Sequence, residues 1–327
     1  MDLQASLGLA LVNLTSPPVL AFVLGLIAVA LRTDLRLPDA VYQATSMYLL
    51  LAIGIKGGVA LRESSPGEIA WPLVATLVLG ILIPIAAFGV LRVLTPLGRI
   101  DRGAMAAHYG STSLVTFTAA IVFLEVSSIA FEGYVATLLT VLEIPGIVVG
   151  LLLAKGLRGG GMGETLREVV FGRSVLLLVG GLAIGFLSGP VGYVRVEPFF
   201  GDLFAGVLTL FLLELGMLTG RQLSAVRQAG PGLVVFAIGF PLIAGAAGVV
   251  GGTLAGMGVG GAMVLGVLCA SASYIAAPAA VRLALPEAKP SITLASSLGM
   301  TFPFNLIIGI PVYLLMAEVM GSWWGGS

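Results

Sequence analysis

Residues 108–120 read HYGSTSLVTFTAA, and residues 270–280 read ASASYIAAPAA. Both stretches are runs of small, hydroxylated residues in the middle of long apolar segments. Each is followed by a further apolar segment with a proline at its centre, LEIPG at 142–146 and MTFPF at 300–304. Polar sequence that weakens a helix is tolerated at membrane depth where it lines a cavity. Its occurrence at matching places in two halves indicates a transporter's binding site.

The composition is that of an integral membrane protein. Of 327 residues, 58% are hydrophobic and 10% are charged, and the mean hydropathy is +1.10, whereas a soluble domain has about 25% charged residues. Sixteen basic and sixteen acidic residues cancel, which leaves no excess of charge to attract nucleic acid. One cysteine excludes an internal disulfide and a cysteine-based metal site. The sequence shows no nucleotide-binding loop, metal triad or nucleophile–base pair. We therefore expect neither an enzyme nor a cofactor or transition metal.

Hydropathy predicts ten membrane spans, near 17–31, 41–61, 70–92, 103–124, 132–154, 174–189, 203–220, 231–255, 259–284 and 290–318. With this count, thirteen Lys and Arg residues fall in the odd loops and only Arg62 and Arg195 in the even loops. The positive-inside rule then places the odd loops in the cytoplasm and both termini outside.

The two halves of the chain resemble each other. VLAFVLGLIAVAL at 19–31 resembles VLLLVGGLAIGFL at 175–187, and LLLAIGIKGGVALR at 49–62 resembles LFLLELGMLTGRQL at 210–223. Because five spans is an odd number, the second half must enter the membrane from the opposite face. The predicted fold is an all-α membrane protein of two inverted five-helix repeats. The repeats occupy residues 1–155 and 174–327, with a cytoplasmic linker at 156–173.

Four polar interruptions are predicted to lie at one depth. At 1.5 Å per residue, Gly110–Ser113 lie about 11–15 Å from one face and Ser271–Ser273 about 18–21 Å from the other. The hydrocarbon core is about 30 Å thick, so both runs fall near its middle. Glu143 and Thr301 also fall near the middle of their spans. We expect these residues to form one site.

The hydroxyls and backbone amides of the two runs could hold a small anion without a lysine or arginine, because helix ends carry unpaired N–H groups and partial charge. The alternative is that these residues only let helices pack closely. Glu143 is the strongest candidate for a cation ligand or proton carrier, because a carboxylate at the bilayer centre is costly. Its alternative is a structural, hydrogen-bonded Glu. Pro145 and Pro303 each remove a backbone donor and so free a carbonyl in their spans.

Other polar residues are candidates for gating or support. His108 is the only histidine, and it is either a proton-sensitive gate or a ring bonded to a backbone carbonyl. Asn305 is expected to support the site from the last span.

The chain resembles the sodium-dependent bicarbonate transporter family of cyanobacteria and other bacteria. The match rests on GST at 110–112, the acidic-Ile-Pro run at 143–145, ASAS at 270–273 and the stretch from Ala277-Pro278 to Pro290-Ser291. The resemblance implies a core domain that moves against a gate domain, a homotrimer in the bacterial inner membrane, and a PII-like signalling protein as partner. It also implies anion contacts from Gly110, Ser111, Thr112, Ser113, Ala270, Ser271 and Ser273, and a sodium ion near Glu143, Thr301 and Ser273.

Three residues depart from the cyanobacterial pattern. Tyr274 stands where that pattern has an aspartate, Glu143 where it has an aspartate before Ile-Pro, and Tyr109 where it has a serine. We place both tyrosines among the gating or supporting residues. The sequence predicts a sodium:bicarbonate symporter. It leaves open a sodium- or proton-coupled carrier of another small organic anion, and a membrane sensor that transports nothing.

Overall fold

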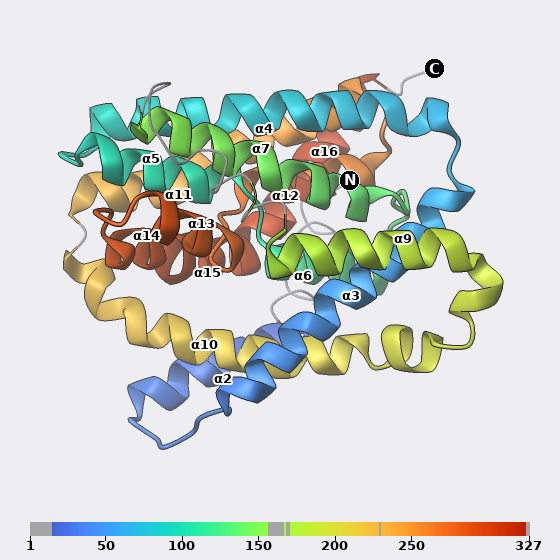
Figure 1. Cartoon of the computed structure of the whole chain (residues 1–327), viewed down its shortest axis with the longest axis horizontal. Coiled ribbons are helices and arrows are strands. Elements are labelled where there is room, and N and C mark those ends of the chain that lie inside the picture. Colours follow the sequence, from blue (N-terminus) through green and yellow to red (C-terminus); the bar gives the residue numbers. More distant parts are fainter. Residues whose placement is uncertain (1–14, 156–166, 168–170, 229, 325–327) are drawn as a thin grey trace.

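The computed structural model describes residues 15–155, 167, 171–228 and 230–324, and all regular structure in this part is helical. This confirms the all-α class. Most of the predicted linker at 156–173 lies outside the described residues. In chain order the helices and π-helical turns (η), most of them labelled in Figure 1, are α2 (Pro17–Ala30), α3 (Asp39–Glu63), α4 (Pro66–Leu94), α5 (Arg99–Gly110), α6 (Leu114–Val126), α7 (Val135–Lys155), α9 (Arg173–Tyr193), η1 (Pro198–Asp202), α10 (Phe204–Gln228), α11 (Pro231–Leu254), α12 (Val259–Ala270), α13 (Ala276–Ala284), α14 (Pro290–Ser296), η2 (Ser297–Thr301), α15 (Phe302–Phe304), η3 (Asn305–Gly309) and α16 (Ile310–Trp324).

Each apolar segment predicted from hydropathy contains one or more helices in the structure. In the described residues, eight helical segments are long and apolar enough to cross a membrane. The first and ninth predicted spans contain shorter apolar helices, α2 with 14 residues and α12 with 12. The chain is therefore a multi-pass membrane protein, while ten crossings and their orientation stay predictions.

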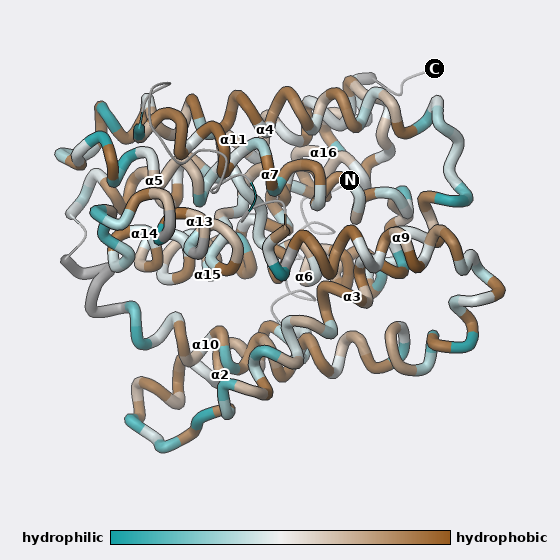
Figure 2. The backbone as a smooth tube through the Cα atoms, in the orientation of Figure 1, coloured by the Kyte–Doolittle hydropathy of each residue, from teal (hydrophilic) through white to brown (hydrophobic). Residues whose placement is uncertain are grey.

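Apolar side chains cover the outside of the molecule. The most apolar windows of α4 and α9 are each only 28% buried, and Trp71 and Leu187 are 68% and 78% exposed. Figure 2 shows the predominantly apolar course of these helices, with hydrophilic residues mostly at their ends. A water-soluble surface rarely carries so large an apolar area. These faces suit contact with lipid.

The helices pack in two groups. In the first, α3 packs on α9 and α2 packs on α10, while the second contains α4 to α7 and α11 to α16. Figure 1 shows α2, α3 and α10 together below the second group. Glycines allow the close crossings in the first group: a Cβ at Gly185 would overlap the carbonyl of Ile55, and one at Gly25 would overlap the carbonyl of Leu213. Small residues permit such close backbone approach in membranes.

The contacts recur in corresponding pairs. The contact of α3 with α9 corresponds to that of α10 with α2, and α4 with α5 corresponds to α11 with α12. Likewise α5 and α4 both contact α7, as α12 and α11 both contact α16. This is the pattern that two five-helix repeats would produce. The opposite orientation of the repeats in a membrane stays a prediction.

The two mid-span prolines behave differently. We expected Pro145 to free a carbonyl within its span, and α7 continues through it as an α-helix from Val135 to Lys155. Proline removes only one helical hydrogen bond, and neighbouring helices in a membrane protein can support the freed backbone. Pro303 lies instead in the three-residue helix α15, with a π-helical turn on each side. The last span is irregular at the predicted place.

Candidate binding site

Both hydroxylated runs interrupt helices, as predicted. Helix α5 ends at Gly110 and α6 begins at Leu114, while α12 ends at Ala270 and α13 begins at Ala276. Helices α5 and α12 each contain 12 residues and begin after a glycine, and each ends at an extended serine, Ser111 or Ser271. The two breaks are therefore built alike.

Hydrogen bonds join the two breaks directly. The amide of Ser273 donates to the carbonyl of His108 at 2.8 Å, and His108 Nδ1 lies 2.6 Å from the carbonyl oxygen of Ser273. Because a carbonyl can only accept, Nδ1 carries the proton and donates. The amide of Ser113 donates to Ser271 Oγ at 2.9 Å. These bonds fix the two extended segments side by side and satisfy backbone groups that the helices leave free.

Ser113 connects the first break to Tyr274. Its hydroxyl accepts from the amide of Thr116 at 3.2 Å and so caps α6. The same hydroxyl donates to the phenol oxygen of Tyr274 at 3.1 Å. Tyr274 is thus bonded to the opposite polar run.

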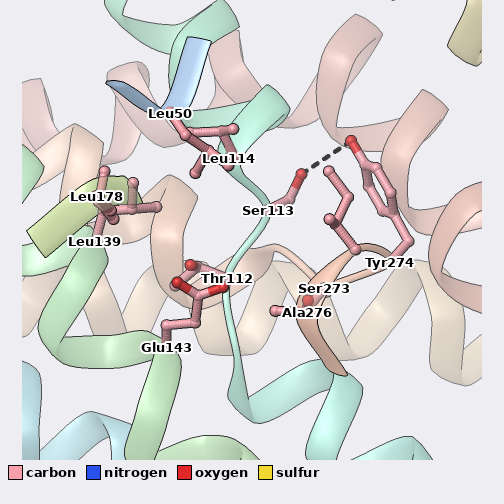
Figure 3. A pocket seen from close by; sticks show the side chains of 11 residues that line it. Leu50, Thr112, Ser113, Leu114, Leu139, Glu143, Leu178, Ser273, Tyr274 and Ala276 are labelled. Carbon is pink, nitrogen blue, oxygen red and sulfur yellow. Dashed lines mark hydrogen bonds between the residues drawn. The ribbon is translucent and has the colours of Figure 1, made fainter. Parts of the chain in front are cut away.

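A cavity lies between the breaks and the first helix group. Its empty volume is about 350 Å³, counted with its open side, and its wall consists of Leu50, Thr112, Ser113, Leu114, Leu139, Glu143, Leu178, Ser273, Tyr274, Ile275 and Ala276. Figure 3 shows these side chains, with the carboxylate of Glu143 pointing toward Thr112. No cationic side chain is among the lining residues. Helices α3 and α9 supply one wall, and α6, α7, α13 and the two breaks supply the other.

Glu143 is the only charged residue in that wall. It is 7% exposed, and within the described residues its carboxylate has no hydrogen bond or ion pair. A buried, unpaired carboxylate is costly. The group therefore needs either a proton or a cation that enters the cavity.

Several residues that were predicted to contact the anion do not line the cavity: Gly110, Ser111, Ala270 and Ser271. Gly110 packs so tightly on α7 that a Cβ at Gly146 would overlap its carbonyl. Ser271 Oγ donates to the carbonyl of Leu268 at 2.8 Å. The carbonyl of Ala270 accepts from Asn305 Nδ2 at 2.8 Å, and the supporting role of Asn305 stays a prediction. Ser111 is buried, and its hydroxyl finds no partner among the described residues.

Thr301 and Tyr109 form a separate link. Thr301 Oγ1 donates to the carbonyl of Ala237 at 2.7 Å and lies 2.6 Å from the phenol oxygen of Tyr109. Because the threonine has given its one proton to Ala237, Tyr109 donates to Thr301. Neither residue lines the cavity. Their roles at a cation and at a gate stay predictions.

The structure adds lining groups from residues that carry no polar side chain. Leu114 and Ala276 are the first residues of α6 and α13 and line the cavity. The amide of a first helical residue has no acceptor within its helix, and neither amide has another partner in the described chain. Leu50, Leu139 and Leu178 complete the wall. Leucines are too common in membrane spans for the sequence to mark these.

Comparison with known proteins assigns the family. The sequence pattern of the Na+-dependent bicarbonate transporter superfamily matches residues 17–318, nearly the whole chain. No curated protein matches the chain. The matched region includes both broken helices, Glu143 and Tyr274. The chain therefore belongs to the Na+-dependent bicarbonate transporter superfamily.

Proposed function

We propose that this protein is a sodium-coupled bicarbonate symporter that binds its anion in the cavity between the two broken helices. Membership of a transporter superfamily favours a carrier over an enzyme. The observation that supports the finer proposal is the unpaired carboxylate of Glu143 in a cavity that otherwise offers hydroxyls and helix amides.

The anion would be held by neutral donors. Ser273 Oγ accepts from the amide of Ala277 at 3.1 Å, so its own proton remains available. The Thr112 hydroxyl has no protein partner in the described part of the chain and lines the cavity. With the amides of Leu114 and Ala276, these groups offer four donors to an oxyanion. Helix N-termini favour negative charge.

Charge balance supplies the coupling. A bicarbonate ion beside the Glu143 carboxylate would place two negative charges in a poorly hydrated cavity, which is unfavourable. A sodium ion between them removes this repulsion and finds the oxygen ligands that hard cations prefer. Anion binding would then require the cation, and the empty carrier would keep Glu143 protonated.

The position of the cavity supports movement of one helix group against the other. Leu50 and Leu178 line it from the first group, whereas Glu143 and Ser273 line it from the second. Displacement of the second group would carry the polar wall away from the leucines and open it to one side. Rigid-body movement of one helix bundle against another is a known mode of alternating access. The trimer and the PII-like partner stay predictions of the resemblance.

Uptake of labelled bicarbonate into proteoliposomes tests the proposal, with an inward sodium gradient or with potassium in its place. The key variant is Glu143→Gln, which keeps the size and removes the charge. The control is Glu214→Gln, because Glu214 is also buried but binds the amide of Leu37 away from the cavity.

We expect sodium-dependent uptake by the wild type and by the control, and a loss of at least about tenfold in Glu143→Gln, as for removal of a charged ligand. Equal uptake in potassium would reject sodium coupling. No uptake by folded wild-type protein would reject bicarbonate as substrate. Full sodium-dependent uptake by Glu143→Gln would remove Glu143 from the cation site.

A further inference from the structure

A second cavity lies beside the broken helices and shares no lining residue with the first. Its empty volume is about 420 Å³, again including its open side. His108 of α5 forms part of its wall, together with Arg282 of α13, Lys289 before α14, and apolar and proline residues between them. Nothing in the proposed transport cycle uses this space.

His108 lines this cavity, and one nitrogen of its ring is buried without a partner in the described chain. Its Nδ1–H donates to the carbonyl of Ser273, so Nε2 of the neutral ring is an acceptor. The residue is fully buried, with 0% exposure, and Nε2 has no partner among the described residues. A buried acceptor without a partner is costly. The cavity should therefore hold a molecule that donates a hydrogen bond.

The rest of the wall favours an anion over water alone. Arg282 and Lys289 are exposed at the edge of the cavity, and no carboxylate lies within ion-pair distance of either in the described chain. The nearest acids are occupied or lie outside the wall: Asp101 accepts from the backbone amide of Lys289 at 2.9 Å, and Glu287 is exposed in the same loop. Water would satisfy His108, whereas an anion would in addition be attracted by both cations.

We propose that this cavity binds a small oxyanion that carries a hydroxyl, such as bicarbonate or hydrogen phosphate. The hydroxyl donates to His108 Nε2, and the charged oxygens face Arg282 and Lys289. Because the other side of the same ring holds Ser273, which lines the first cavity, an anion here acts on the transport site through one side chain. The binding part of this proposal does not depend on the transport proposal.

Isothermal titration of the purified protein tests the site, with sodium phosphate and sodium bicarbonate as separate probes. The main variant is the double substitution Arg282→Gln with Lys289→Gln. The matched control is Lys155→Gln with Arg173→Gln, which removes the same charge from residues outside both cavities. A third variant, His108→Asn, keeps a donor near the position of Nδ1 for Ser273 and removes the acceptor at Nε2.

We expect the wild type and the control to bind phosphate alike, and the double variant to bind about tenfold to a hundredfold more weakly, as for loss of charged hydrogen bonds. His108→Asn should weaken binding by about two- to tenfold, as for one neutral hydrogen bond. If bicarbonate but not phosphate shows this pattern, the site is a second site for the substrate. If neither anion binds, or all variants bind equally, the proposal is wrong and water fills the cavity.

Uptake measurements separate this inference from the transport proposal. Phosphate should change the rate of bicarbonate uptake by the wild type and leave the double variant unaffected. If phosphate binds but does not change bicarbonate uptake, the anion site stands and its proposed effect on the transport site through His108 and Ser273 is wrong. Absence of bicarbonate uptake together with specific phosphate binding would reject only the transport proposal.

Discussion

The hydroxyl of Ser113 donates a hydrogen bond to the phenol oxygen of Tyr274 across 3.1 Å. This bond joins the start of α6 to the segment before α13, so it connects the two halves of the chain at the binding cavity. Tyr274 also packs its ring edge-on against Phe302, with the ring centroids 5.4 Å apart. Tyr274 is therefore part of the scaffold as well as of the cavity wall.

This arrangement predicts an order of stabilities for two conservative variants. Tyr274→Phe removes one hydrogen bond, worth about 1 kcal/mol. Ser113→Ala should cost more, because it also removes the cap on the Thr116 amide, worth about 0.5–2 kcal/mol. Thermal unfolding in detergent should therefore rank wild type above Tyr274→Phe and Tyr274→Phe above Ser113→Ala. The reverse order would show that the serine's bonds are weak and that the phenol has a further partner.

The crossing of α3 and α9 predicts opposite effects for two glycines of α9. A Cβ at Gly185 would overlap the carbonyl of Ile55, whereas one at Gly180 would meet nothing within 4 Å. Gly185→Ala should destabilise by about 1–3 kcal/mol, as overpacking does. Gly180→Ala should be neutral or stabilise by up to about 1 kcal/mol, because alanine favours the helix. Thermal unfolding of the two variants measures this, and equal melting temperatures would contradict a tight crossing.

Two acidic side chains form similar hydrogen bonds near the first residues of α12 and α5. Glu132 Oε1 accepts from the amide of Gly258, which precedes α12, at 2.6 Å. Asp101 in α5 accepts from the amide of Lys289, which precedes α14, at 2.9 Å. Bonds to a charged acceptor are worth about 1.5–3 kcal/mol. Glu132→Ala and Asp101→Ala should each lower the melting temperature, and the double variant should show the sum, because the sites are well separated. If only one of the two substitutions lowered the melting temperature, the two hydrogen bonds would not be equivalent.

How far the sequence predicts this site depends on the kind of signal that each residue leaves. The breaks after Gly110 and Ala270 could be predicted because small hydroxylated residues are unusual inside apolar spans. The unequal behaviour of Pro145 and Pro303 could not, because neighbouring helices decide whether a proline breaks a span. The sequence also could not show that Thr301 lies outside the cavity that Glu143 lines. Depth along a span is readable from the sequence, but the face that a helix turns toward its neighbours depends on packing.

The partner of Lys56 likewise depends on packing and could not be predicted from the sequence. Lys56 falls within the predicted span 41–61, and the structure pairs its Nζ with Glu125 Oε1 at 3.5 Å, with the side chains 38% and 47% exposed. The pair lines a further cavity between α3, α6 and the start of α7, with an empty volume of about 580 Å³ counted with its open side. The same three helices line the binding cavity, through Leu50, Leu114 and Glu143. Lys56 is therefore a cation in a cavity whose walls come from three helices that also line the candidate site.

Removal of this cation should slow capture of the anion without unfolding the protein. Exposed ion pairs contribute about 0–1 kcal/mol, so Lys56→Gln and Glu125→Gln should both keep the melting temperature within a few degrees. Because a cation near a site raises the local concentration of anions, Lys56→Gln should raise the KM for bicarbonate and leave kcat unchanged. Glu125→Gln should leave the KM unchanged or lower it. The KM values from proteoliposome uptake at low salt measure the difference, which should shrink as added salt screens the charge. Equal effects of the two variants would mean that the pair only ties α3 to α6, and that Lys56 has no direct part in attracting the anion.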